Sequence, residues 1–163
     1  MNRAQRRAAA RQRTKPQRRH ADPGAAHTLL TIHRPFSEDE AAHIAVGARL
    51  AWHKLTTGAG NESEFDILAT AANVALIRAE SIDAIAVEVV QRAQAALVRM
   101  QERYRRVGKF GPDADALATV PEFLDLYDQI VRLSTPRQLV DAVNAAMRRI
   151  HDGAILNSLE QKD

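Results

Sequence analysis

The sequence contains no cysteine among its 163 residues. This absence excludes disulfide bonds, thiolate nucleophiles, cysteine-ligated zinc and iron–sulfur clusters, and it fits a reducing compartment. Long apolar runs are also lacking: no stretch approaches the roughly 18 to 20 residues that a membrane-spanning helix needs. The basic start is not followed by the apolar core of a secretory signal. We therefore expect a cytoplasmic protein that does not enter a membrane.

Acidic residues are absent from the first twenty positions, where basic residues are concentrated. The whole chain has 23 Lys and Arg against 20 Asp and Glu, a net charge of +3. Without the eight bases of positions 1–20, residues 21–163 keep 15 bases against 20 acids, a net charge of −5. Such asymmetry is typical of a tail that binds a charged partner. The eight bases, our candidate nucleic-acid-binding residues, are Arg3, Arg6, Arg7, Arg11, Arg13, Lys15, Arg18 and Arg19.

These bases define a predicted arm, residues 1–27, in front of a helical domain, residues 28–163. If the arm were helical, Arg3, Arg7 and Arg11 would line one face at four-residue spacing and repel one another. We therefore expect the free arm to be disordered. Basic side chains bind phosphates by charge and counterion release, without reading sequence. The arm has no aromatic residue on which the bases of a single strand could stack.

Helix-capping patterns recur through the rest of the chain. Ser37 and Glu40 form a capping box, and the same spacing recurs from Thr119 and from Thr135. Between these signals, apolar residues repeat at three- and four-residue steps, and no alternating run predicts a strand. The sequence predicts an all-α fold, a bundle of about five amphipathic helices with a disordered basic N-terminal arm. The predicted helices cover about residues 37–57, 61 or 63 to 80, 82–107, 119–131 and 135–153, and an alternative adds a helical turn over residues 113–118 before the fourth helix.

The helical periodicity also predicts the environment of particular side chains. Asp66, Asn73 and Glu80 lie seven residues apart and share one face, which we expect to be solvated or half-buried. A buried Asn73 would instead fix helix register or bind a partner's backbone. Trp52 is expected in the core. The last predicted helix has an apolar stripe made of Leu139, Val143, Met147 and Ile150.

Residue patterns that carry chemistry are few. Glu40 and His43 have the spacing of a di-iron bundle motif, but such sites need the motif twice and two more glutamates, and no second copy exists. Glu40 is also required by the capping box. The glycines at 58 and 60 lack the lysine and the preceding strand of a phosphate-binding loop. We therefore predict no catalytic residues, no metal site and no cofactor.

A second cluster of bases ends the third predicted helix. It consists of Arg99, Arg103, Arg105, Arg106 and Lys109, with Glu102 among them. One interpretation is a solvated helix end, where cations complement the negative end of the helix dipole. The other is a nucleic-acid-binding face that joins the arm.

Two resemblances indicate a genomic context. Residues 2–11 resemble the arginine-rich, RNA-binding N-terminal peptides of some phage antitermination proteins, which fold as helices on their RNA hairpins. A longer pattern resembles small uncharacterised helical proteins of proteobacterial prophages and mobile elements, and it implies this context without assigning site residues. The pattern comprises residues 52–55, Gly58, Asp66, Leu68, Asn73, Ala75, residues 79–80, residues 105–108 and residues 135–138.

Three functions follow from these observations. The first is a nonenzymatic accessory protein of a phage or mobile element, whose acidic helical body binds a protein partner and whose basic arm binds nucleic acid or nucleoprotein. The second is an inhibitor of a host factor, such as a defence system. The third is an enzyme with a site assembled across helices. An exposed apolar patch would favour the binding functions, whereas a polar pocket with convergent histidines and carboxylates would favour the enzyme.

Overall fold

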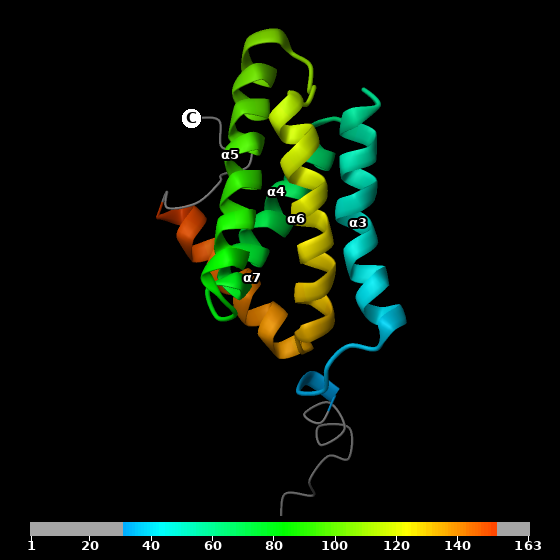
Figure 1. The fold of residues 1–163 in the computed structure, drawn as a ribbon, viewed down its shortest axis with the longest axis vertical. Coiled ribbons are helices and arrows are strands. Elements are labelled where there is room, and N and C mark those ends of the chain that lie inside the picture. The colour runs from blue at the N-terminus through cyan, green and yellow to red at the C-terminus, as the bar shows by residue number, and fades with distance from the viewer. Residues whose placement is uncertain (1–30, 153–163) are drawn as a thin grey trace, which may run out of the picture. The chain divides into compact units, whose positions relative to one another are not determined.

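The computed structural model describes residues 31–152. No strand occurs within this range. The all-α bundle predicted from the sequence is therefore confirmed over the described residues, and the predicted arm, residues 1–27, lies outside them. The described helices are α3 (Glu38–Thr56), α4 (Glu62–Ala79), α5 (Ala84–Val107), α6 (Ala114–Leu133) and α7 (Pro136–His151) (Figure 1).

Helix α4 is the central element of the described bundle. It packs against α3, α5, α6 and α7, and 11 of its 18 residues are buried. Several of the buried residues are alanines, such as Ala69, Ala72 and Ala75, and their small side chains allow neighbouring helices to approach closely. By contrast, α7 packs mainly against α4 and runs obliquely to α3, α5 and α6 (Figure 1).

An aromatic stack connects the core to the loop after α5. Phe65 of α4 is fully buried, and its ring centroid lies 5.2 Å from that of Phe110. Phe110 in turn stacks on Tyr104 with a centroid separation of 4.1 Å. Gly108 ends α5 with a φ of 71°, a left-handed conformation that glycine adopts without strain. The loop is therefore held against the first turns of α4.

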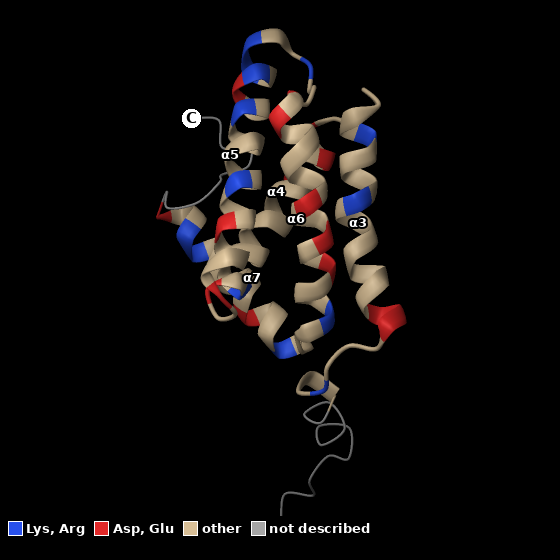
Figure 2. Cartoon of the chain, viewed as in Figure 1, with Lys and Arg blue, Asp and Glu red and all other residues tan. Residues whose placement is uncertain are grey.

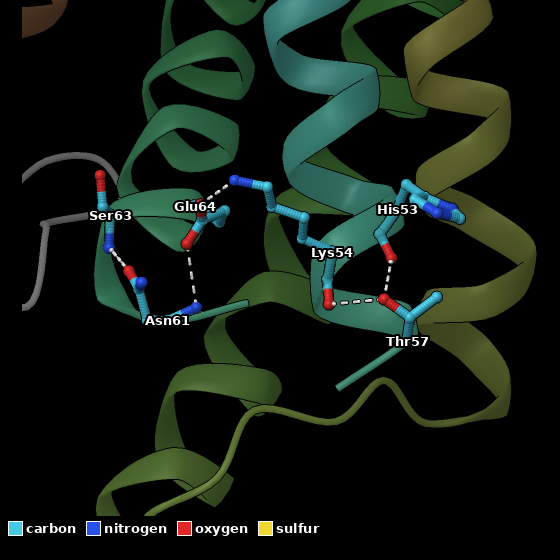
Figure 3. A network of polar contacts seen from close by, with 6 residues as sticks. All are labelled: His53, Lys54, Thr57, Asn61, Ser63 and Glu64. Atoms are coloured by element: carbon cyan, nitrogen blue, oxygen red, sulfur yellow. Dashed lines mark hydrogen bonds and ion pairs between the residues drawn. The ribbon is translucent and has the colours of Figure 1, made fainter. Parts of the chain in front are cut away.

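The turn between α3 and α4 is fixed by polar contacts. Asn61 caps α4, with its side-chain oxygen accepting from the Ser63 N–H at 2.7 Å (Figure 3). Glu64 completes the capping box by accepting from the Asn61 N–H at 3.0 Å, and it also accepts from Lys54 Nζ at 2.8 Å. The Lys54 bond, followed by the Asn61 bond, lowers the pKa of Glu64 below its usual range. This network joins the end of α3 to the start of α4.

Gly60 lies too close to α3 to carry a side chain. A Cβ at this position would be 2.8 Å from Leu55 N and 2.9 Å from Leu55 Cα, whereas a Cβ on Gly47 would meet nothing within 4 Å. Gly60→Ala is expected to lower the free energy of unfolding by about 1–3 kcal/mol, the usual cost of overpacking. Gly47→Ala, inside α3, is expected to raise it by about 0.5–1 kcal/mol. Urea denaturation measures both, and equal effects would contradict the close approach at Gly60.

The predicted capping box at Thr119 does not start α6, which includes the alternative preceding turn. The helix begins at Ala114 and is capped by Asp113, whose Oδ1 accepts from the Ala116 N–H at 2.7 Å. Thr119 lies inside the helix and donates its hydroxyl to the Asp115 carbonyl at 2.9 Å, so it does not cap. Pro121 consequently lies within the helix and not in its first turn. The start at Ala114 is more stable than a start at Thr119 because it adds further helical turns and buries Ala116.

The predicted environment of Asn73 is also wrong. Its side chain is 1% exposed, and its Oδ1 accepts from Gln94 Nε2 of α5 at 2.8 Å. Seven-residue spacing does not mark an outer face here, because four helices surround α4. Trp52, expected in the core, is half-buried and packs against it. Glu80, by contrast, is exposed and pairs with Arg149 of α7 at 2.5 Å.

Candidate functional site

The eight arm residues predicted to bind nucleic acid lie outside the described residues. Within residues 31–152, an apolar groove with a volume of about 530 Å³ lies on α4 between α3 and α7. We call it the α4 groove. Its apolar lining comes from three helices and one residue of a fourth: Ile44, Gly47 and Ala48 of α3, Ile67, Ala71 and Val74 of α4, Leu139 and Val143 of α7, and Tyr127 of α6.

The polar lining of the α4 groove is acidic at one end. Glu62, Ser63 and Asp66 belong to the first turns of α4, and Thr70 lies one turn further along. None of the described lining residues is Lys or Arg. Tyr104 donates its hydroxyl to Glu62 Oε1 at 2.7 Å, and this bond raises the pKa of Tyr104. The groove thus combines apolar walls with negative charge at the N-terminal end of α4.

One wall of the groove continues into an exposed apolar line on α7. Val140, Val143 and Met147 are 55%, 41% and 65% exposed, and we call them the α7 ridge. Two residues of the predicted apolar stripe, Val143 and Met147, are therefore exposed. Ala142 and Ala146 are buried instead, packed with Val74. Since α7 has one principal neighbour, the face with the small alanines packs closely and the larger side chains stay exposed.

The cationic end of α5 is partly neutralised by α6. Arg99 pairs with Asp113 at 3.2 Å and also with Asp115, and these carboxylates raise the pKa of the guanidinium, Asp113 contributing most. The pKa of Asp113 is lowered first by the Ala116 N–H and then by Arg99. Basic residues predominate along the length of α5, and acidic residues predominate along α6 (Figure 2). The remaining exposed bases of this end, Arg103, Arg105, Arg106 and Lys109, fit a solvated helix terminus.

Other acids of α6 are engaged by α3. Arg49 Nη2 lies 2.7 Å from Asp125 and 2.6 Å from Asp128, and Arg49 Nε donates to Asp128 at 3.0 Å. The Asp128 bond, then the Asp125 bond, raises the pKa of Arg49. These carboxylates hold two helices together and are not displayed as an unpaired acidic row. The contacts weaken the case for an inhibitor that imitates nucleic-acid phosphates.

The histidines of residues 31–152 do not lie in a cluster of metal-ligating side chains. Within residues 31–152, no three His, Asp or Glu side chains lie close enough together to hold a metal ion. Glu40 completes the capping box of α3, accepting from the Ser37 N–H at 2.7 Å, as predicted. The Ser37 bonds lower the pKa of Glu40.

The comparisons with known proteins give no assignment. No family model, curated protein or solved structure matches the chain. Among helices α3 to α7, none has the length and apolar character that crossing a membrane requires. Function is therefore inferred from the charge distribution of the sequence and from the α4 groove.

Proposed function

We propose that the protein is a nonenzymatic accessory protein of a phage or mobile element, with a basic arm that binds nucleic acid and an acidic helical body that binds a protein partner. The observation that carries the proposal is the separation of two kinds of binding surface. Residues 1–20 hold eight bases and no acid, while the described lining of the α4 groove holds acids and no base. A charged arm and an apolar groove suit different partners.

The arm fits nucleic acid because its chemistry is that of phosphate binding. Eight bases within twenty residues can neutralise several phosphates and release their counterions, which gives affinity without sequence specificity. The remainder of the chain carries a net charge of −5, so it opposes this binding over long range. The arm alone therefore accounts for nucleic-acid affinity in this proposal.

The α4 groove fits an amphipathic helix of a partner protein. Ile44, Ile67 and Leu139 offer an apolar surface contributed by three helices, as in other grooves that receive the apolar face of a helix. Asp66 and Glu62 place negative charge at one end, so the partner helix should carry a basic residue there. The apolar lining of the groove suits the burial of a partner's apolar side chains.

Neutralising the arm tests the proposal in the full-length protein. Substituting glutamine for all eight arm bases is expected to weaken duplex DNA or RNA binding at about 50 mM salt by at least about a thousandfold, because the phosphate contacts are lost. The matched control replaces Arg103, Arg105 and Arg106, three exposed bases of α5, by glutamine. This control should retain wild-type affinity within about twofold. Fluorescence anisotropy measures both, and unchanged affinity in the arm variant would refute the proposed role of the arm.

A further inference from the structure

Helix α7 is covered on one side only. Its 16 residues extend about 24 Å at 1.5 Å per residue. Ala142 and Ala146 are buried against α4, while the α7 ridge is exposed beside that contact. The ridge residues follow one another at three- and four-residue steps, the spacing of a seam that packs against a second helix.

The two flanks of the α7 ridge differ in chemistry. On the helical wheel, Arg137, Asp141 and Arg148 lie together on one flank. Arg137 Nε donates to Asp141 Oδ2 at 2.9 Å, and all three side chains are exposed or at the surface of the helix. The opposite flank carries Leu139, which lines the α4 groove together with the ridge residue Val143.

We propose that the protein forms a symmetric dimer in which the α7 ridges of two copies pack antiparallel. If the two-fold axis passes between Val143 and Asn144, Val140 of each copy lies opposite Met147 of the other. Two-fold symmetry then brings identical flanks together. Arg148 comes within two residues, about 3 Å of axial rise, of Asp141 in the second copy. Asp141 thus lies between two bases, Arg137 of its own chain and Arg148 of the second copy.

A second copy fits this face better than an unrelated helix because the ridge is complementary to itself in both size and charge. The pairing joins a valine to a methionine at each end and an acid to a base along one flank. It forms one closed interface under two-fold symmetry. Val143 belongs both to the ridge and to the groove lining, so the dimer covers this edge of the α4 groove. Two arms per dimer would also raise nucleic-acid affinity by avidity.

The oligomeric state of the full-length protein without nucleic acid tests the proposal. Light scattering and sedimentation equilibrium should give twice the chain mass of 18.0 kDa for the wild type. Val140→Glu and Met147→Glu are each expected to raise the dimer dissociation constant at least about tenfold, because they place charge in the interface. Ile85→Glu is the matched control, since Ile85 is 75% exposed on α5 and should leave the dimer intact. A monomeric wild type, or equal dissociation of the Ile85 variant, would overturn the proposal.

A charge exchange tests the antiparallel arrangement. Asp141→Arg and Arg148→Asp should each weaken the dimer, because each places like charges next to one another across the two-fold axis. The double variant Asp141→Arg/Arg148→Asp restores opposite charges and should recover most of the wild-type dissociation constant. If the double variant is as weak as the single variants, the antiparallel pairing of α7 is wrong. Because the exchange does not involve the arm, this result is independent of nucleic-acid binding.

Discussion

Phe65→Ala is expected to lower the free energy of unfolding by about 3–5 kcal/mol, the range for truncating a buried aromatic side chain. Phe65 has no exposed surface, and its ring packs in the main core beside the stack of Phe110 and Tyr104. The substitution removes buried apolar area and leaves a cavity between α4 and the loop after α5. It also removes one member of the aromatic stack, so the loop loses its principal contact with α4.

Urea denaturation followed by circular dichroism measures this effect. Ile85→Ala is the control, because Ile85 is exposed and its truncation should change the free energy of unfolding by no more than about 0.5 kcal/mol. A loss at Phe65 no larger than at Ile85 would mean that the aromatic stack is not part of the folded core.

Asn73→Ala is expected to lower the free energy of unfolding by about 1–3 kcal/mol, because it removes a hydrogen bond from the buried Asn73 and leaves the half-buried Gln94 amide without this partner. The group left behind is Gln94 Nε2, which donates to Asn73 Oδ1 at 2.8 Å between α4 and α5. The bond therefore fixes the register of these two helices as well as satisfying two amides.

A double-mutant cycle with Gln94→Ala isolates this bond. The two single substitutions should each be destabilising, and the double variant should be more stable than their sum predicts by about 0.5–1.5 kcal/mol. Strictly additive effects would show that Asn73 stabilises the bundle through other contacts and that the Gln94 bond contributes nothing.

The helix starts were the most predictable part of the fold, because capping is a local interaction. Ser37 and Thr135 cap α3 and α7 at the predicted positions, each within a complete capping box. Asn61, one of two predicted alternatives, caps α4. At α6, two capping signals compete six residues apart, and sequence alone does not weigh Asp113 against Thr119. The choice depends on burial of the intervening turn, which is a tertiary effect.

The candidate site was much less predictable, because it depends on how helices are placed against one another. The apolar spacing of α7 predicted a stripe without saying how much of it is buried, and Met147 in that stripe is exposed because α4 is the principal neighbour of α7. Conversely, Asn73 looked like part of a polar face, yet α4 is enclosed on several sides. The α4 groove is formed by residues of α3, α4 and α7, so it depends on how these helices are placed and not on any local sequence pattern. The available signal in the sequence was that α7 carries more apolar residues than one packed face needs, and this indicates an exposed apolar surface.

The salt dependence of nucleic-acid binding is the most direct test of the central claim, that the arm and the body have different binding functions. The affinity of full-length protein for duplex DNA should fall with a slope of up to about −7 in log K against log salt, if all eight arm bases contact phosphates at about −0.9 each. The slope should approach zero when the eight bases are glutamine. Equal slopes for the two proteins, or a flat wild-type response with no binding at low salt, would contradict the division of function between arm and body.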